Sequence, residues 1–145
     1  MTHFLVVAHQ TATSPELLRC VSGLAYDDPQ AAFTILVPAT PVAHLLTWEE
    51  GETQAIAKQR AEDARSLFEE SGLTVAQAKI GDASPLLAIG DELMSHPGQY
   101  DTIVLSTLPP RISRWLRLDV HNRAERKFGI PVIHVEVGNT IKGNV

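Results

Sequence analysis

The segment Phe4-Leu5-Val6-Val7-Ala8, followed by His9-Gln10-Thr11 and then by Ser14-Pro15-Glu16, decides the fold class of this chain. The five apolar residues form a continuous β-rich run, which is typical of a strand covered on both faces. Ser14 predicts a helix N-cap, Pro15 suits the first helical position, and Glu16 places an acid in the first turn. A buried strand, a polar loop and a helix in this order predict the first unit of a parallel α/β sheet.

The same alternation of strand and helix patterns continues along the chain. Further strands are predicted at residues 33–37, 74–80, 100–106 and 130–137, and the polar character of 74–80 suits a sheet edge. Helices are predicted up to Asp27, up to Gly72, from Ser84-Pro85 to Pro97, and from about Ile112 to Gly129. This order predicts a single α/β domain over residues 1–145 with a mostly parallel sheet, and a flexible tail at 138–145.

Length and composition fit this class. A chain of 145 residues, 44% hydrophobic and 20% charged, can bury roughly 68–70% of its unfolded surface, which excludes disordered and fibrous classes. The single cysteine, Cys20, permits no internal disulfide and no Cys-based metal site, and fits a reducing cytoplasm. No segment has the pattern of a signal peptide or of about 18 uninterrupted apolar residues, so we expect a cytoplasmic protein without a membrane span.

The charge of the chain is unevenly distributed. The net charge is −5, but residues 1–110 hold 5 Lys/Arg against 14 Asp/Glu, whereas residues 111–145 hold 7 against 3. Half of all the basic residues fall within one short segment: Arg111, Arg114, Arg117, Arg123, Arg126 and Lys127. This cluster indicates an anionic ligand or partner, whereas a pI of about 5.6 argues against nucleic acid.

The loops that follow the strands are the places to search for a site, because ligands of open α/β sheets bind beyond the carboxyl ends of the strands. The turn from Ser106 to Arg117 is the most informative of them. The hydroxyls of Ser106 and Thr107 can donate to phosphate oxygens, and Arg111 and Arg114 can engage an oxyanion. The alternative is a rigid Pro109-Pro110 turn with solvated arginines.

Other chemistry has weaker support. The chain has no phosphate loop, dinucleotide turn, serine-hydrolase elbow or zinc-protease motif. No ligand spacing links His9, His44 and His121, and we place His121 two or more turns into the last helix. Asp82 is explained by turn chemistry and Asp119 by pairing with neighbouring arginines. Ser106 and Thr107 have no nearby histidine in the sequence to act as a base, so we predict no catalytic residue and no metal.

The whole chain resembles the universal stress protein family. The resemblance rests on the strand end Val37-Pro38, the Gly81-Asp82-x-x-Pro85 turn, the strand Tyr100 to Val104, and the final Ile130-Pro131-Val132-Ile133-His134-Val135. It implies a Rossmann-like three-layer α/β/α sandwich with strand order 3-2-1-4-5, and a cytoplasmic homodimer joined through the last strand, Ile130–Val137. It also implies a candidate nucleotide or anion site at His9, Gln10, Val37, Pro38, Ser106, Thr107, Arg111 and Arg114.

The chain departs from the nucleotide-binding members that it resembles. Those members carry an Asp after the first strand and a G-x-x-G-x9-G-[ST] motif after the fourth. Here His9 or a neighbour takes the Asp position, and the glycine positions fall near Ser106, Pro109 and Leu118 or Asp119. Proline removes a donor and side chains obstruct the close approach that glycine allows, so this departure argues against binding of ATP or another adenine nucleotide.

Two functional hypotheses follow. The first is a non-catalytic binding or stress-response protein with a degenerate nucleotide site and no certain cofactor. The second is a nucleotide- or phosphate-binding switch, or a small-molecule enzyme, that uses the Ser106–Arg117 loop.

Overall fold

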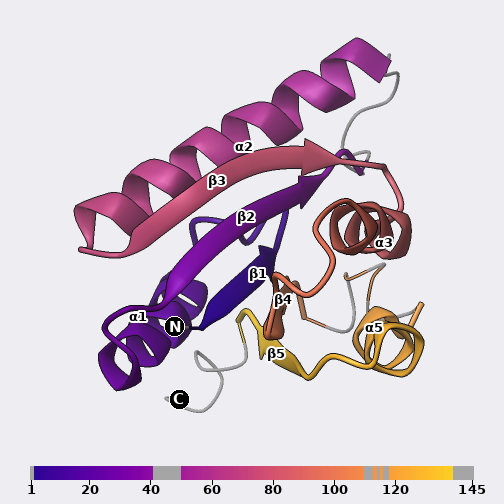
Figure 1. Ribbon diagram of the computed structural model, residues 1–145. Helices are drawn as coiled ribbons and strands as arrows, with labels where there is room; N and C mark the ends of the chain where they lie inside the picture. The colour runs from indigo at the N-terminus through magenta and orange to yellow at the C-terminus, as the bar shows by residue number, and fades with distance from the viewer. Residues whose placement is uncertain (1, 41–49, 110–112, 114, 116–117, 139–145) are drawn as a thin grey trace.

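A computed structural model of the chain describes residues 2–40, 50–109, 113, 115 and 118–138. The strands are β1 (His3–Val7), β2 (Ala32–Pro38), β3 (Thr74–Gly81), β4 (Thr102–Thr107) and β5 (Val132–Glu136). The helices are α1 (Pro15–Asp27), α2 (Glu50–Glu70), α3 (Pro85–Ser95) and α5 (Val120–Phe128). Figure 1 shows these elements alternating along the chain, as the sequence predicts.

The five strands form one parallel sheet in the order β3-β2-β1-β4-β5. This order confirms the predicted fold class and the position of β3 at a sheet edge. The central strand β1 is paired on both sides, with Val7 level with Leu36 of β2 and with Leu105 of β4. The strand order reverses between β1 and β4, and this reversal is the place where such sheets bind ligands.

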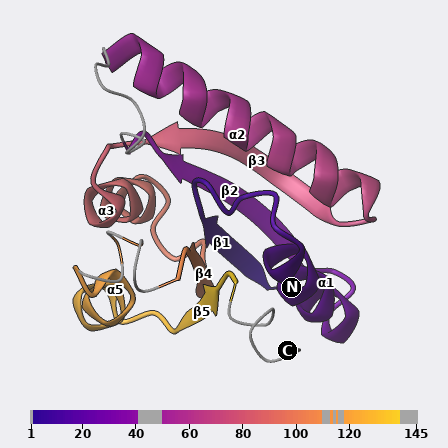
Figure 2. The ribbon, with the colours of Figure 1, turned by 180° about the vertical axis from the view of Figure 1, so that it is seen from behind.

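Helices cover both faces of the sheet. Helices α1 and α2 lie on one face and α3 and α5 on the other, and the view from behind in Figure 2 shows the same two layers. Alternate residues of β1 enter the two cores, so Phe4 and Val6 face α1 and α2 whereas Leu5 and Val7 face α3 and α5. The uninterrupted apolar run of β1 therefore exists because both faces of this strand are covered.

The two Ser-Pro helix starts follow the predicted capping chemistry. The Ser14 hydroxyl accepts a hydrogen bond from the Leu17 amide at 3.2 Å, and the Ser84 hydroxyl accepts one from Leu87 at 3.4 Å. The Asp82 carboxylate accepts from the Ser84 amide at 2.9 Å, which is the turn role predicted for it. Within the described residues, no helix is both long enough and apolar enough to cross a bilayer.

The prediction of one continuous helix from about Ile112 to Gly129 is wrong, because the chain is helical at Trp115 and forms a turn at residues 118–119 before the last helix. Helix α5 begins at Val120, after a turn in which Asp119 takes a left-handed conformation with φ of 53°. A helix cannot continue through a left-handed residue, so the apolar spacing on either side of Asp119 belongs to separate segments. Ile112 itself lies outside the described residues.

Candidate functional site

The reversal of strand order brings the loop after β1 beside the end of β4. His9 and Thr11 lie in this loop, and Ser106 and Thr107 are the last two residues of β4. All four side chains are buried. The structure thus places three residues predicted for the site at the carboxyl ends of the central strands: His9, Ser106 and Thr107.

A side-chain hydrogen bond links the two sides of this edge. The Thr11 and Ser106 hydroxyl oxygens are 2.7 Å apart, and both residues are almost completely buried, at 3% and 1% exposed. A hydroxyl that is committed to a buried partner gives up that bond when it binds a phosphate oxygen. The Thr11–Ser106 bridge therefore occupies the position between β1 and β4 where an open sheet accepts its ligand.

The next residue of β4, Thr107, points to the opposite face of the sheet from Ser106, and its hydroxyl contacts a histidine. The Thr107 hydroxyl lies 2.7 Å from Nε2 of His134 in β5, and the His134 ring stacks on His121 with a centroid distance of 4.6 Å. Burial lowers the pKa of His134, and the neighbouring His121 lowers it further. The imidazole is therefore neutral near pH 7, and its nearest partner is a threonine that is only 2% exposed. A nucleophile needs access to its substrate, so this pair forms part of the packing.

His9 presents a different kind of polar group. It is 6% exposed, and its Nε2 atom has no hydrogen-bond partner within the described part of the chain. Burial lowers its pKa to about 4, and the positive charge of Arg60 on α2 contributes to the shift. At the position where the resemblance described above implies an acid, this chain holds a neutral imidazole that feels the positive charge of Arg60.

The remaining predicted site residues differ in their surroundings. Gln10 is exposed, whereas Val37 and Pro38 are buried at the end of β2, where Pro38 pairs with Gly81. Arg111 and Arg114 lie outside the described residues.

The turn after β5 covers the end of β4. The Val137 amide donates to the Thr107 carbonyl at 2.8 Å, and the Gly138 amide donates to the Glu16 carboxylate at 2.9 Å. Gly138 has φ of 98°, and a Cβ atom there would lie 3.0 Å from Pro109. Val137 and Gly138 are thus held between the first turn of α1 and the loop that leaves β4, whereas the rest of the tail predicted at 138–145 lies outside the described residues.

Three residues of this region were missed by the sequence interpretation. Thr11 sits in the loop after β1, where a ligand is expected, but nothing in its spacing indicates a contact with Ser106. His134 interrupts an apolar strand, which was the one available signal for a polar contact beside Thr107. Arg60 lies within the charged pattern of α2, which resembles any solvated helix face.

One prediction about a single residue was wrong, and two others cannot be judged in full. His121 is the second residue of α5 and so lies in its first turn, because the predicted helix is interrupted at Asp119. Asp119 accepts a hydrogen bond from Asn122 at 2.8 Å and Arg123 donates to the Leu118 carbonyl, whereas Arg114 and Arg117 lie outside the described residues. His44 lies outside the described residues. Across the residues that the structure describes, no group of three or more His, Cys, Asp or Glu side chains could hold a metal ion.

Breaking the Thr11–Ser106 bridge from one side should lower the free energy of unfolding. Thr11→Val removes one hydroxyl without changing the shape of the side chain and leaves the Ser106 hydroxyl buried without this partner, which costs about 1 kcal/mol. The double variant Thr11→Val/Ser106→Ala should cost less than the sum of the two single variants. Urea unfolding measures all four proteins, and strictly additive losses would contradict a direct bond between these side chains.

Comparison with known proteins identifies the fold. No protein-family model matches the sequence, and no curated protein has significant sequence similarity to it. A universal stress protein family member from Burkholderia pseudomallei has a similar structure, with a TM-score of 0.59 at 14% identity over 92% of this chain and 95% of that one. The chain has the fold of a universal stress protein. A second solved structure, a universal stress protein in complex with cAMP, gives a TM-score of 0.58 at 14% identity over 92% and 96% of the two chains.

The universal stress protein fold gives a structural reading of Asp119. In the family resemblance, the third glycine of the nucleotide motif falls near Leu118 or Asp119. Asp119 is the only non-glycine residue in the described part of the chain with a positive φ. Glycine adopts this conformation without steric cost, and Asp tolerates it better than most residues. Asp119 thus holds a left-handed backbone conformation that glycine adopts readily.

Proposed function

We propose that this protein is a non-catalytic binding protein of the universal stress protein type, which acts in the cytoplasm in the stress response. Its single domain has the universal stress protein fold, but the site at the strand ends does not bind a nucleoside triphosphate. The observation that carries this proposal is the 2.7 Å contact between the Thr11 and Ser106 hydroxyls, which crosses the position where the strand order reverses.

The side chains around this bridge support the same proposal. A triphosphate is bound by backbone amides that approach it closely, and glycines make this approach possible. Here Ser106 is buried against Thr11, and Pro109 has no amide hydrogen and lies against Gly138. These contacts leave little of the close backbone approach that a triphosphate requires.

The alternative is a switch that binds a smaller phosphate compound or nucleotide. The unpartnered Nε2 of His9, with the positive charge of Arg60 nearby, favours this alternative. One structural neighbour was solved in complex with cAMP, which makes cAMP a suitable probe for this chain. In both hypotheses the ligand would have to bind without an Asp after β1.

Thermal unfolding with added ligands distinguishes the two hypotheses. The proposal predicts that ATP leaves the melting temperature unchanged up to about 5 mM, and that the pure protein does not hydrolyse ATP. A ligand present at 100 times its dissociation constant stabilises a protein by roughly 2.7 kcal/mol, so real binding would be visible. A saturable shift with cAMP, AMP or phosphate that is lost in His9→Phe would favour the switch.

The proposal includes a homodimer joined through β5. This strand is at an edge of the sheet, all five of its residues are half-buried, and Ile133 and Val135 pack on the core. An apolar open edge is a liability that pairing with a second copy removes. Light scattering should give twice the chain mass of 15.8 kDa. Val135→Lys should shift the mass toward the monomer, and a wild-type protein that is monomeric at micromolar concentration would contradict this part of the proposal.

A further inference from the structure

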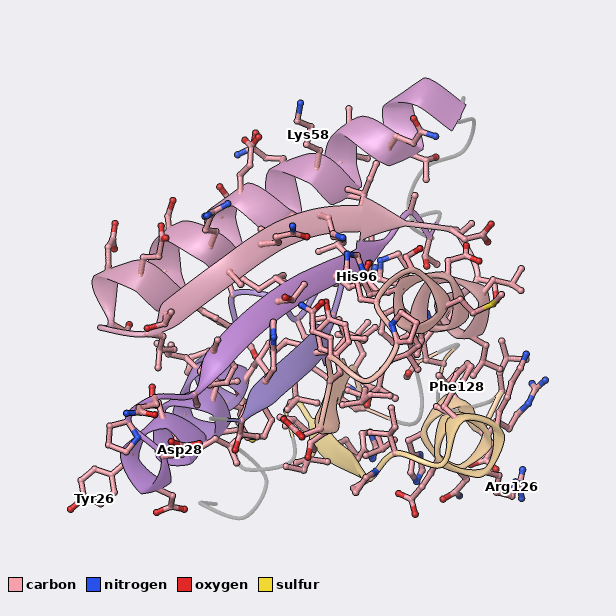
Figure 3. The ribbon with its side chains drawn as sticks, in the orientation of Figure 1. Tyr26, Asp28, Lys58, His96, Arg126 and Phe128 are labelled. Atoms are coloured by element: carbon pink, nitrogen blue, oxygen red, sulfur yellow. The ribbon has the colours of Figure 1, made fainter. Side chains whose placement is uncertain are left out.

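An open groove lies between helices α3 and α5, the two helices that cover one face of the sheet. The groove has a volume of about 270 Å³ and is lined by Leu86 of α3 and by Arg123, Arg126 and Lys127 of α5. Figure 3 shows Arg126 projecting from α5 away from the sheet, and Phe128 between α5 and α3. These residues are separate from the strand-end residues of the candidate site.

Helix α5 packs on α3 beside the groove. Gly90 of α3 lies one turn after Leu86, and a Cβ atom at this position would be 3.5 Å from the Phe128 ring, which is an ordinary van der Waals distance. Phe128 of α5 therefore lies close to α3 at Gly90. Arg123 and Lys127 are four residues apart, so they lie on the same face of α5.

The described residues that line the groove carry positive charge. Leu86, Arg123, Arg126 and Lys127 line it, and no Asp or Glu is among these described lining residues. Glu125 on the same helix is directed to β5, where its carboxylate accepts from the Val132 amide at 3.2 Å. Within the part of the chain that the structure describes, the ion pairs involve only Arg65, Lys79 and His96 as bases, so the three cations of the groove form no ion pair there. Arg123 donates to the Leu118 carbonyl, and Lys127 lies 5.6 Å from the centre of the Phe128 ring.

Apolar side chains lie exposed on the helix that forms the other wall. Leu87 is 53% exposed and Met94 is 81% exposed, and both lie on α3. They are seven residues apart, which places them on one face of the helix. Methionine is common on surfaces that bind partners because its side chain adapts to their shape.

We propose that the α3–α5 groove binds an acidic protein segment that carries large apolar residues. Carboxylates of the segment would pair with Arg123, Arg126 and Lys127, and its apolar side chains would cover Leu86, Leu87 and Met94. Charge complementarity selects an anion, and the exposed apolar residues select a ligand with apolar groups of its own. A flat anionic membrane would leave the concave part of the surface unfilled, so a peptide segment fits better.

Fluorescence anisotropy with labelled synthetic peptides tests this proposal. The probe is a peptide of about 14 residues in which Leu recurs every three to four positions among Glu residues. We expect saturable binding at low salt that weakens as salt is added. A Lys/Leu peptide of the same pattern should not bind. A Glu/Ser peptide should have a dissociation constant at least about tenfold higher than that of the Glu/Leu peptide.

Matched charge variants locate the binding surface. The groove variant Arg126→Glu/Lys127→Glu should bind the Glu/Leu peptide about tenfold more weakly than wild type, or weaker still. The control variant Arg19→Glu/Lys58→Glu has the same net charge as the groove variant, but its substitutions are on α1 and α2. This control should bind the peptide as wild type does. Lys58 is exposed on α2, in the other helical layer. Because acids near the end of α5 oppose its dipole, Arg126→Gln/Lys127→Gln serves as a milder second variant, and circular dichroism checks that each protein is folded.

Three results would overturn the proposal. The first is no saturable binding of the Glu/Leu peptide by folded wild-type protein. The second is equal weakening in the groove variant and in the α1–α2 control, which would indicate general electrostatic attraction. The third is groove-dependent binding to phosphatidylserine vesicles without binding to the peptide, which would assign the surface to a membrane.

Discussion

Replacing Glu92 by Gln is expected to lower the free energy of unfolding by about 2–3 kcal/mol at pH 7. Glu92 is on α3 and is 6% exposed, which is unusual for an acid. Its Oε1 atom accepts from Lys79 of β3 at 2.9 Å, and its Oε2 atom accepts from the Tyr100 hydroxyl at 2.5 Å. The charged carboxylate therefore fastens α3 to the sheet at two places, and an amide cannot serve both donors equally well.

The groups around Glu92 extend this polar cluster toward the start of β1. Burial and Glu92 together raise the pKa of Tyr100 to about 12, so its hydroxyl remains a donor. The His3 ring contacts the Tyr100 ring edge-on at 4.8 Å and lies 2.9 Å from the Thr34 hydroxyl. His96 Nδ1 lies 3.2 Å from Oε2 of Glu92. Loss of the carboxylate would thus remove the common acceptor of the cluster.

The pH dependence of this effect has a definite sign. Burial alone would raise the pKa of Glu92, but the hydrogen bonds from Tyr100 and Lys79 outweigh it, so this pKa lies below the ordinary value for a glutamate. A lowered pKa contributes stability that is complete above the unfolded value and disappears as the pH falls through the folded value. The difference between wild type and Glu92→Gln should therefore be full at pH 7 and shrink below about pH 4.5.

Urea unfolding of both proteins across this pH range measures the effect. Asp91→Asn is the matched control, because Asp91 is the exposed neighbour of Glu92 on the same helix and its loss should change stability by less than about 0.5 kcal/mol. Equal urea midpoints for wild type and Glu92→Gln at pH 7 would contradict this account of the cluster.

Gly81→Ala should lower the free energy of unfolding by about 2 kcal/mol, because overpacking in a close contact forces neighbouring groups apart. Gly81 ends β3, where the chain turns toward α3. A Cβ atom there would lie 2.8 Å from Cβ of Ala88 and 3.0 Å from Cδ1 of Leu36. Ala88 is held by its helix and Leu36 is 2% exposed in the core, so neither can move cheaply.

Gly23→Ala is the matched control for this substitution. Gly23 lies exposed in α1, and a Cβ atom there would meet no atom within 4 Å. Alanine is a better helix former, so this variant should gain about 0.5–1 kcal/mol. Urea denaturation compares both variants with wild type. A Gly81→Ala protein as stable as wild type would show that the contact between the end of β3 and α3 is looser than described.

The sequence predicted the fold well because the relevant signals are local. The apolar run of residues 4–8 indicated a strand covered on both faces, and Ser14-Pro15 and Ser84-Pro85 marked helix starts that the capping hydrogen bonds confirm. The error at the fourth predicted helix has a physical cause as well. Asp119 has a left-handed backbone conformation, and the presence of an Asp at this position does not predict that conformation.

The candidate site was predictable only in part. Ligands of open α/β sheets bind beyond the carboxyl ends of the strands, and this rule led to His9, Ser106 and Thr107, which the structure places together at those ends. It could not show that Ser106 is bonded to Thr11 or that Thr107 is bonded to His134, because these pairs are 95 and 27 residues apart in the chain. Pairing over such distances is fixed by the register of β4 with β1 and β5, and no local pattern encodes it.

This chain shares its fold with universal stress proteins, but a shared fold does not show that their functions are the same. The solved universal stress protein structures are 14% identical to this chain, and at this level the likeness concerns architecture alone. Activity has to be argued from the strand-end residues. Here the Thr11 and Ser106 hydroxyls are bonded to each other, the imidazole of His9 is neutral and unpartnered at Nε2 among the described residues, and Asp119 is left-handed.

Isothermal titration of ATP into the purified wild-type protein tests the central claim most directly, with cAMP titrated in parallel. The account predicts no saturable heat from ATP for wild type, because the hydroxyls at the end of β4 are already paired within the protein. Saturable binding of about one ATP per chain that is weakened by Ser106→Ala would contradict the account and assign a working nucleotide site to this edge of the sheet.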